Sequence, residues 1–246
     1  METVMYKNKT FLAIIPARSG SKGIIDKNIR EINHKPLMAY TLEACKRSGI
    51  FDDIVVSTDS EKYAGIAKRF GASVPFLRPK ELASDQASSN DVILHVIDGL
   101  QHLGKTFDCF MLLQPTSPLR NEKHMIESAG ILLENNADSV VSICKSDSSS
   151  YLTVELSEEG RVKTLFSDKK QVRRQDMPPE YRINGAIYLA LTSYFVKNKS
   201  FYEGKTLPYF MSAFDSIDID DDFQMKIAEL LLLDKNLSNP SQQECN

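Results

Sequence analysis

The chain has 246 residues, of which 42% are hydrophobic, and its 30 basic and 33 acidic residues give a formal net charge of −3. This length and apolar content suit one α/β domain with a substantial core, and the balanced charge argues against a nucleic-acid-binding surface. No apolar run approaches the ~20 residues that span a bilayer, and the polar N-terminus lacks a signal-peptide core. The four cysteines form no C-x-x-C pair. We therefore expect a cytoplasmic protein with reduced thiols and no membrane partner.

Strand-like and helix-like segments alternate along the first 144 residues. In chain order, we expect a strand at Phe11–Ile15, a helix from Pro36 to about Gly49, a strand at Asp53–Ser57, a helix from Ser60 to Gly71, an extended piece at Val74–Leu77, a helix around Ile93–Leu100, and buried strands at Phe107–Leu113 and Ser139–Cys144. The helix boundaries follow from proline in a first turn, serine as a cap and glycine at an end. This alternation predicts an α/β fold whose mainly parallel sheet carries helices on both faces.

The pattern changes after Lys145. Two alternating segments, Tyr151–Leu156 and Arg161–Phe166, flank a Glu-Gly pair and predict a hairpin. A strand at Gly185–Leu191 then resumes the sheet, and an amphipathic helix marked by Phe223, Ile227, Leu230 and Leu231 closes the fold. We expect one domain over residues 1–235, with residues 145–183 as an inserted antiparallel excursion and residues 236–246 as a polar tail.

A loop of small and basic residues follows the first strand. It reads I-I-P-A-R-S-G-S-K-G from residue 14 and continues to Lys27 and Asn28, with Arg18, Ser21 and Lys22 inside it. Backbone N–H groups and cations in such a loop bind phosphate. The spacing matches neither the P-loop nor the dinucleotide-binding pattern. Because ligands collect beyond the carboxyl ends of strands in α/β sheets, we favour a triphosphate site over a solvated basic loop.

Two further segments carry candidate polar groups. Gln114 ends an apolar strand within L-L-Q-P-T-S-P-L-R, where its amide can bind substrate, although a rigid turn with capping hydroxyls explains the segment equally well. In D-S-I-D-I-D, an extended chain would point Asp218 and Asp220 to one side, as hard ligands suited to Mg²⁺. Asp221 and Asp222 are better explained as a helix cap.

Arginines mark a fourth segment. R-R-Q-D begins at Arg173 and Y-R-I-N-G-A-I-Y at Tyr181. The planar fork of arginine fits a carboxylate with two hydrogen bonds, and salt bridges at a subunit interface remain the alternative. The four histidines have no metal-binding spacing, and no Ser-His-Asp or Cys-His set is evident.

Taken together and in order, these segments resemble the acylneuraminate cytidylyltransferases, the CMP-sialic acid synthetases. The resemblance runs from Ile14 to about Leu233 and includes V-S-T-D ending at Asp59 and L-R-P-K-E-L-A-S-D ending at Asp85. It implies a Rossmann-like three-layer nucleotide-diphospho-sugar transferase fold, and a homodimer in which residues 145–183 reach over the partner's site. It also implies that, with Mg²⁺, the anomeric hydroxyl of a nine-carbon 2-keto acid attacks the α-phosphate of CTP and expels pyrophosphate.

The resemblance also implies roles for individual residues. The nucleotide-binding set is Ala17, Arg18, Ser21, Lys27, Asn28, Arg78 and Ser89. The acid-binding set is Gln114, Arg174 from the other subunit, Arg182, Asn184, Tyr188, Phe201 and Tyr202. Asp218 and Asp220 would hold Mg²⁺ and, with Arg18 and Lys27, form the catalytic set. Ile25 stands where the family often has proline, and Tyr202 stands where it often has phenylalanine.

Several functions stay open within this fold. N-acetylneuraminate is the expected acid, but legionaminate or pseudaminate differ from it in substituents and stereochemistry that the sequence does not resolve. An eight-carbon Kdo substrate is disfavoured because Asp26-Lys27-Asn28 replaces the G-K-P-L segment typical of those enzymes. A non-catalytic nucleotide-binding protein would be expected to lose charged groups, whereas Lys27, Asp218 and Asp220 are present.

Overall fold

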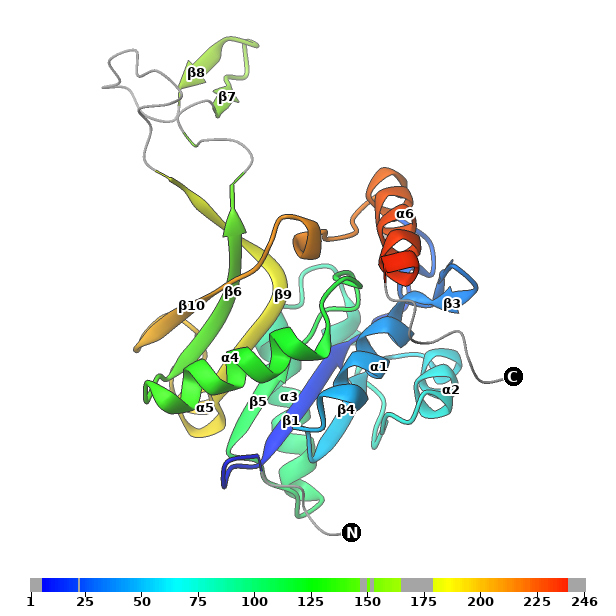
Figure 1. Ribbon diagram of the computed structural model, residues 1–246, viewed down its shortest axis with the longest axis vertical. Helices are drawn as coiled ribbons and strands as arrows, with labels where there is room; N and C mark the ends of the chain where they lie inside the picture. Colours follow the sequence, from blue (N-terminus) through cyan, green and yellow to red (C-terminus); the bar gives the residue numbers. More distant parts are fainter. Residues whose placement is uncertain (1–5, 22, 147–149, 151–152, 165–178, 239–246) are drawn as a thin grey trace.

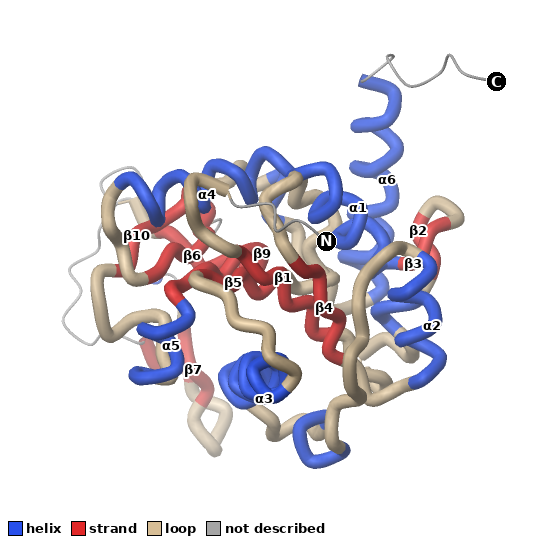
Figure 2. The backbone as a smooth tube through the Cα atoms, turned by 90° about the horizontal axis from the view of Figure 1, so that it is seen from below, coloured by secondary structure: helices blue, strands red, loops and turns tan. Residues whose placement is uncertain are grey.

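The computed structural model describes residues 6–21, 23–146, 150, 153–164 and 179–238. Its centre is a six-stranded sheet with the order β10-β6-β9-β5-β1-β4. The strands are β1 (Phe11–Pro16), β4 (Asp53–Ser57), β5 (Cys109–Leu112), β6 (Ser139–Lys145), β9 (Tyr181–Leu191) and β10 (Thr206–Phe210). Helices cover both faces of this sheet, which gives the three layers seen in Figures 1 and 2.

Strand directions place one end of β9 at the edge where a ligand would bind. β1 pairs in parallel with β4 and β5, and β6 pairs in parallel with β10. β9 lies between β5 and β6 and runs antiparallel to both, with Leu112 opposite Tyr188. The expected mainly parallel α/β sheet is confirmed, with one antiparallel strand at its centre. Residues 181–187 therefore extend past the carboxyl end of β5, beside the loops that follow β1 and β5.

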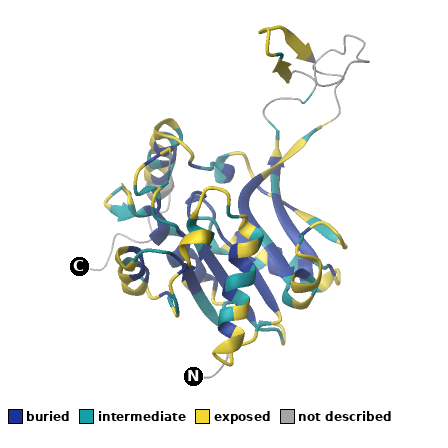
Figure 3. Ribbon diagram, turned by 180° about the vertical axis from the view of Figure 1, so that it is seen from behind, coloured by how far each residue is buried: buried dark blue, intermediate teal, exposed yellow. Residues whose placement is uncertain are grey.

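The helices divide into two groups by the face they cover. Figure 2 shows α1 and α4 on one face of the sheet and α3 and α5 on the other. Side chains of α1, α2 and α4 share one buried cluster, and those of α3 and α5 share a second. The bounds are α1 (Leu37–Ser48), α2 (Glu61–Arg69), α3 (Ser89–His102), α4 (Glu122–Glu134) and α5 (Thr192–Asn198). Figure 3 shows buried strands flanked by helices with exposed outer surfaces.

Local signals in the sequence set the element boundaries. Ser60 accepts a hydrogen bond from the Tyr63 N–H at 3.4 Å, as its predicted capping role requires. Gly49 ends α1 in the left-handed region, with φ at 64°, where glycine is favoured. The extended piece expected at Val74–Leu77 adds no strand to the sheet, because Ser73 forms the bridge to Val55 instead.

The closing helix α6 (Asp222–Ser238) presents a different face from the predicted one. Among its described side chains Met225, Ala228 and Leu232 are buried, at helical spacing, and they pack in a third cluster with Ile24 and Ile32. Phe223 and Leu230 are mostly exposed. The prediction of a helix is confirmed, but the choice of Phe223 and Leu230 as packing residues is wrong. Those positions lie outside the i, i+3, i+7 stripe that meets the domain.

The inserted segment contains the expected hairpin. β7 (Val154–Leu156) pairs antiparallel with β8 (Val162–Thr164), and Figure 1 places this hairpin away from the sheet, beyond the ends of β6 and β9. A second small antiparallel pair, β2 (Glu31–Ile32) and β3 (Lys35–Pro36), follows the basic loop. No helix in the described part of the chain is long and apolar enough to cross a membrane.

Candidate active site

A cleft of about 390 Å³ lies at the carboxyl edge of β1 and β5. This is the edge where α/β sheets bind ligands. The cleft brings together eight of the predicted site residues from five separate segments. These are Arg18, Ser21, Lys27, Asn28, Arg78, Ser89, Gln114 and Asp220.

The loop after β1 is held in shape by contacts with α2. Asp26 has φ at 55°, a left-handed conformation that is uncommon for a residue other than glycine. Its carboxylate accepts hydrogen bonds from the Lys62 ammonium and the Tyr63 hydroxyl, each at 3.0 Å. Asn28 is buried and donates to the Arg18 carbonyl at 3.1 Å. These contacts fix the backbone on both sides of Lys27 before any ligand binds.

Lys27 links this loop to the aspartate segment. Its ammonium donates to the Ile219 carbonyl at 2.7 Å and lies 3.3 Å from Asp220 Oδ1. The Lys27 side chain is only 15% exposed, whereas that of Asp220 is 74% exposed. A cation held by buried contacts beside a solvent-facing carboxylate suits a place where phosphate and a metal ion meet.

Arg18 reaches to the other wall of the cleft. Its guanidinium donates to the Ala83 carbonyl at 3.1 Å and pairs with Asp85 at 2.6 Å. The neighbouring Ser19 donates its N–H and its hydroxyl to Asp59, at 2.7 and 2.6 Å. Burial raises the pKa of the Asp59 carboxyl, but the hydrogen bonds from Ser19, the backbone N–H of Asp59 and the charge of Arg78 together leave the pKa lowered. Asp59 is therefore a fixed anion that anchors the loop, while Asp85 neutralises Arg18.

Arg78 is a buried cation that lines the cleft. It donates to the Ser57 hydroxyl at 3.0 Å and to the Ser57 carbonyl at 2.7 Å. Burial lowers the pKa of its guanidinium to about 10, so Arg78 remains charged at neutral pH. Ser89, which begins α3, also lines the cleft. Ala17 is fully buried behind the cleft, where its N–H donates to the Ser57 carbonyl at 2.9 Å.

Asp218 carries the partly buried carboxylate of the site. Burial raises the pKa of this carboxyl and the charge of Asp220 adds to the increase, while Thr116, Lys27 and Arg182 act in the opposite direction. The segment bearing both aspartates is not a strand, so the expected strand geometry is absent.

The two aspartates suit a hard divalent cation. Asp218 Oδ1 is buried and has no hydrogen-bond partner within the described residues. No group of three or more His, Cys, Asp and Glu side chains that could hold a metal occurs in the described ranges. A carboxylate pair with an unpaired buried oxygen fits Mg²⁺, which completes its shell with water and phosphate oxygens. The predicted capping role of Asp221 is confirmed, because Asp221 Oδ1 accepts from the Gln224 N–H at 2.9 Å.

The predicted aromatic residues Tyr188, Phe201 and Tyr202 group near Asp218, outside the lining of the cleft. Burial raises the pKa of the Tyr188 hydroxyl, and the charges of Tyr202 and Asp218 add to the increase, which places these three groups near one another. Tyr188 packs on Phe201 with ring centroids 5.3 Å apart. Phe201 is 5% exposed and belongs to the core, whereas Tyr202 is 54% exposed. Tyr202 is therefore the more accessible of the two neighbouring aromatics.

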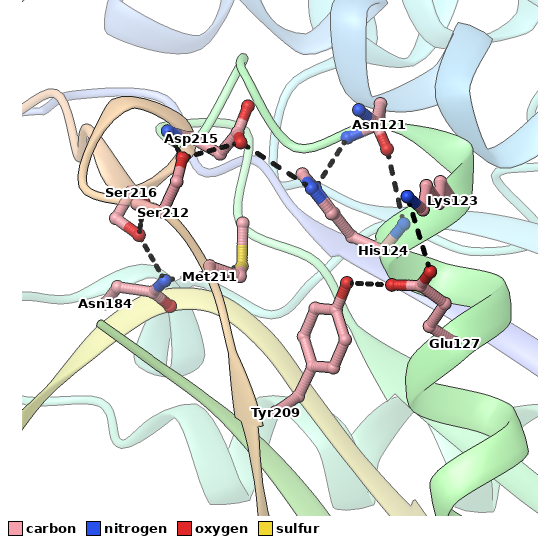
Figure 4. A network of polar contacts seen from close by, with 10 residues as sticks. All are labelled: Asn121, Lys123, His124, Glu127, Asn184, Tyr209, Met211, Ser212, Asp215 and Ser216. Atoms are coloured by element: carbon pink, nitrogen blue, oxygen red, sulfur yellow. Dashed lines mark hydrogen bonds and ion pairs between the residues drawn. The ribbon is translucent and has the colours of Figure 1, made fainter. Parts of the chain in front are cut away.

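Asn184 is bound within the protein. It is 1% exposed and donates to the Ser216 hydroxyl at 2.8 Å (Figure 4). Its amide oxygen accepts from the Ser142 hydroxyl at 2.6 Å. Its amide oxygen also accepts from the Ala186 N–H at 3.2 Å. The structure thus places Asn184 behind the site rather than in the cleft, where it joins β9 to the turn at Phe214–Ser216.

The remaining predicted residues divide into one described residue and two outside the described ranges. Arg182 is exposed at the start of β9, and one guanidinium nitrogen lies 3.5 Å from the Ser216 carbonyl. Lys22 and Arg174, together with the rest of R-R-Q-D, lie outside the described residues.

Four residues of the site had no role assigned from the sequence. Asp59, Asp85 and Arg120 end the motifs V-S-T-D, L-R-P-K-E-L-A-S-D and L-L-Q-P-T-S-P-L-R, and Gly185 lies in Y-R-I-N-G-A-I-Y. Their motif membership was the available signal. Their partners come from distant parts of the chain, so local spacing could not supply a role.

A three-layer α/β sheet with a polar cleft at its carboxyl edge is an architecture of nucleotidyltransferases. Residues 12–237 match the family model described as cytidylyltransferase, and the chain belongs to that family.

Relatives and solved structures agree with this assignment. The chain is 38% identical over 226 residues to an N-acylneuraminate cytidylyltransferase of Escherichia coli O18:K1:H7, covering 92% of the chain and 52% of that protein. A protein of the same name from Streptococcus agalactiae serotype V is 39% identical over 223 residues, with coverage of 89% and 53%. The chain thus spans about half the length of these two relatives. A CMP-N,N'-diacetyllegionaminic acid synthase of Legionella pneumophila is 38% identical over 227 residues, covering 90% of the chain and 95% of that protein.

Two solved structures share the fold. CMP:2-keto-3-deoxy-manno-octonic acid synthetase complexed with CTP superposes with a TM-score of 0.68 at 14% identity, covering 92% of this chain and 99% of that one. The 4-diphosphocytidyl-2C-methyl-D-erythritol synthase of Anaerococcus prevotii gives a TM-score of 0.62 at 14% identity, with the same coverage. At this identity the likeness establishes the fold alone, and it confirms the expected nucleotide-sugar transferase architecture.

Proposed function

We propose that the protein transfers CMP from CTP to the anomeric hydroxyl of a nine-carbon 2-keto sugar acid, with N-acetylneuraminate as the first candidate. Pyrophosphate is the leaving group. The observation that carries this proposal is the meeting of Lys27 and Asp220 at 3.3 Å on the rim of the cleft that Gln114 also lines. In this proposal, groups that bind phosphate and groups that bind the sugar acid, which is the acceptor of CMP, share one cleft. The 38–39% identity to N-acylneuraminate cytidylyltransferases supports the choice of acid.

Nucleotidyl transfer asks for positioning and charge neutralisation more than for covalent help from the protein. Arg18 and Lys27 are the cations placed to receive the triphosphate, and Lys27 is the one beside the aspartates. Ser21, Asn28, Arg78 and Ser89 complete the nucleotide side, with Ala17 forming the backbone wall behind it. Asp218 and Asp220 would hold Mg²⁺, which supplies charge neutralisation of the triphosphate when bound.

In this proposal Gln114, Tyr188 and Tyr202 bind the acid, and Phe201 supports them from the core. Gln114 lines the cleft, and Phe201 is buried. Arg182 is exposed beside Asp218 and can hold the acid's carboxylate with its guanidinium fork. Arg174 of the other subunit remains a predicted contributor, and it lies outside the described residues. Asn184 acts in this proposal by holding β9 in place.

A legionaminate derivative is the second candidate acid. It is favoured by the synthase that matches this chain at 38% identity over 95% of its own length. The exposed Tyr202, where the family often has phenylalanine, adds a hydroxyl that could meet a different substituent.

We also propose that the protein works as a homodimer in the cytoplasm. The hairpin carries exposed apolar side chains at Val154, Leu156 and Val162, and Tyr181 and Ile183 are further exposed apolar side chains at the start of β9. Contiguous exposed apolar side chains mark interaction surfaces, and a second copy of the same hairpin is a matching partner. Cys45, Cys109 and Cys144 are buried free thiols, as expected in a reducing compartment.

Pyrophosphate release tests the proposed reaction. The protein is incubated with CTP, Mg²⁺ and, separately, N-acetylneuraminate, legionaminate, pseudaminate or Kdo, and ATP, GTP and UTP serve as nucleotide controls. Release that requires both CTP and one nine-carbon acid supports the proposal and identifies the acid. Binding of CTP without release for any acid would favour a non-catalytic nucleotide-binding protein. Release with Kdo alone would assign the eight-carbon reaction instead.

A further inference from the structure

Arg120 is a charged side chain buried behind the cleft. It is 1% exposed and lies in the turn between β5 and α4. Its guanidinium donates to the Gln114 carbonyl at 3.1 Å, to the Ala186 carbonyl at 2.7 Å and to the Thr41 hydroxyl at 2.6 Å. One planar group thus ties together the end of β5, the strand β9 and the helix α1.

This arrangement is costly, because burying a charge without a paired anion is unfavourable. No carboxylate pairs directly with Arg120 in the described part of the chain, and its Nε atom has no hydrogen-bond partner there. Burial lowers the pKa of the guanidinium to about 10, which still leaves it charged at neutral pH, and the charge of Asp218 acts against this decrease. An apolar residue could fill the same volume without that cost, so a purely packing role does not explain an arginine.

The three groups that accept hydrogen bonds from Arg120 show which parts of the site it holds together. Two are backbone carbonyls, of Gln114 at the cleft and of Ala186 in the irregular part of β9. The β6–β9 register shifts between Val141 and Ile143, opposite this part of β9. Arg120 therefore holds the backbone of a bulge against the backbone that carries the Gln114 amide.

Gly185, next to Ala186, occupies the critical position of that bulge. Its φ is 75°, a conformation that favours glycine. A Cβ at this position would lie 3.3 Å from Asp218 Oδ2 and 3.3 Å from Gln114 Oε1. The bare Cα therefore allows the Asp218 carboxylate and the Gln114 amide to lie over the same point of the backbone.

We propose that Arg120 and Gly185 are positioning residues. They fix the Gln114 amide, which binds the sugar acid in the proposed function, relative to the Asp218 carboxylate, which lies on the triphosphate side. The inference rests on the proposed function, because it concerns the alignment of the acceptor with CTP. Arg120 acts through the Gln114 and Ala186 carbonyls from behind, and Gly185 acts by leaving space in front. Neither residue contacts the nucleotide in this arrangement.

This positioning role predicts that a substitution changes the kinetic parameters for the sugar acid but leaves the affinity for CTP unchanged. Misplacing a reacting group by about 1 Å can cost about 100-fold in rate. We therefore expect Arg120→Lys, which keeps the charge but loses the planar fork, to lower kcat/KM for the acid by about 10–100-fold. The dissociation constant for CTP, measured by calorimetry without acid, should stay within about twofold, since the groups to which Arg120 donates, on Gln114, Ala186 and Thr41, are not part of the loop at residues 17–28.

Gly185→Ala provides a second variant that does not depend on Arg120. Its matched control is Gly104→Ala, because Gly104 has the same φ of 75° but no atom within 4 Å of a new Cβ. Both variants carry similar backbone strain, so Gly104→Ala corrects for it, while Gly185→Ala adds the two contacts at 3.3 Å and should melt at least as low as the control. We expect Gly185→Ala alone to lose acid kcat/KM, by about 10-fold or more.

A double-mutant cycle with Gln114→Ala tests whether Arg120 acts through Gln114. If it does, Arg120→Lys should lower kcat/KM for the acid by less than about threefold in a protein that already carries Gln114→Ala. The inference is overturned if Arg120→Lys keeps kcat/KM for the acid near that of wild type, or if CTP binding weakens in parallel with acid turnover. It is also overturned if the losses caused by Arg120→Lys and Gln114→Ala multiply in the double variant.

Where Arg120→Lys does not fold, the comparison of Gly185→Ala with Gly104→Ala decides, and equal activities overturn the inference. A wild-type protein that uses no nine-carbon acid refutes the proposed function and this inference together, whereas active wild type with unaffected variants refutes the inference alone.

Discussion

The proposed nucleotide half and the proposed acceptor half of the site, where the acceptor is the sugar acid, are built in different ways. The nucleotide half consists of loops that line the cleft, and two of its cations are paired with protein carboxylates, Arg18 with Asp85 and Lys27 with Asp220. The acceptor half consists of strand β9 and aromatic side chains that belong partly to the hydrophobic core. Side chains in the first half can change partners when a ligand binds, whereas those in the second half are fixed by packing.

This difference predicts how each half responds to substitution. Exposed ion pairs contribute little to stability, about 0–1 kcal/mol, so a triphosphate can replace the carboxylate partners at small cost. Buried aromatic pairs contribute far more through the area they remove from water. Substitutions in the nucleotide half should therefore change rate or affinity with little effect on unfolding, and substitutions of the buried aromatic residues in the acceptor half should change stability as well.

Lys27→Ala is expected to give the largest effect on turnover. Removal of one group that stabilises charge in the transition state costs about 10²–10³ in rate. Steady-state kinetics at saturating CTP and Mg²⁺ should report this loss, with the melting temperature nearly unchanged. Lys105→Ala is the control, because Lys105 pairs with Asp53 at 2.8 Å outside the cleft. Turnover of Lys27→Ala close to that of wild type would remove Lys27 from the mechanism.

Phe201→Ala tests the acceptor half through stability. Phe201 is 5% exposed and packs on Phe195 with ring centroids 4.8 Å apart. Truncating a buried phenylalanine costs about 3–5 kcal/mol, so the free energy of unfolding from urea titration should fall by that amount. Tyr202→Ala, at the exposed neighbouring position, should change it by less than about 0.5 kcal/mol. Similar losses for both variants would contradict the division into core and contact residues.

Asp218→Asn should raise the Mg²⁺ concentration needed for half-maximal activity by about tenfold, because it replaces a hard anionic ligand with a neutral amide. Asp221→Asn is the matched control, since asparagine caps a helix as well as aspartate does. An unchanged Mg²⁺ titration for Asp218→Asn would exclude Asp218 as a ligand.

The same variant has a second, opposite effect on stability. Burial raises the pKa of the Asp218 carboxyl, so its protonated form is favoured in the folded state and its ionisation destabilises the fold. The stability that the protonated Asp218 carboxyl contributes is therefore fully present below the pKa of the unfolded state, and it is lost as the pH rises through the pKa of the folded state. Without metal at pH 7, Asp218→Asn should melt higher than wild type, and the difference should vanish as the pH falls below the unfolded pKa of aspartate. A lower melting temperature at pH 7 would contradict the burial argument.

Asp85→Asn should give the smallest effect. It removes the negative charge that pairs with Arg18 at 2.6 Å, so phosphate no longer competes with a carboxylate for that guanidinium. The Michaelis constant for CTP should fall by about two- to fivefold at low salt, with less change at high salt. A rise in the constant would instead identify Asp85 as a residue that orients Arg18 for binding.

Much of the fold could be predicted because its signals are local. Ser60 caps a helix with its own hydroxyl, and Gly49 ends one with its own backbone conformation. The direction of β9 could not be predicted, because an apolar strand pairs either way and the long insertion before it leaves both directions open. The strand at Thr206–Phe210 was missed because it is a short edge strand interrupted by Pro208.

In the candidate site, too, residues with a signal in their own motif could be predicted, whereas roles that depend on distant partners could not. Lys27 and Asp220 were predicted as site residues and lie together, although 193 positions separate them in the sequence. Asn184 was grouped with its motif as a substrate ligand, but its partners Ser142 and Ser216 come from other elements and hold it behind the cleft. Arg120 could not be assigned from the sequence, since its partners are mainly backbone carbonyls that any residues would supply.

Analysis of the products by ³¹P NMR and mass spectrometry tests the central claim most directly. CTP, Mg²⁺ and the acid selected by pyrophosphate release would be incubated with the protein, and the phosphorus-containing products identified. The account predicts a single phosphodiester that joins CMP to the nine-carbon acid, formed in equal amount with pyrophosphate. Free CMP with unchanged acid, or CTP left intact, would contradict the transfer of CMP to a sugar acid.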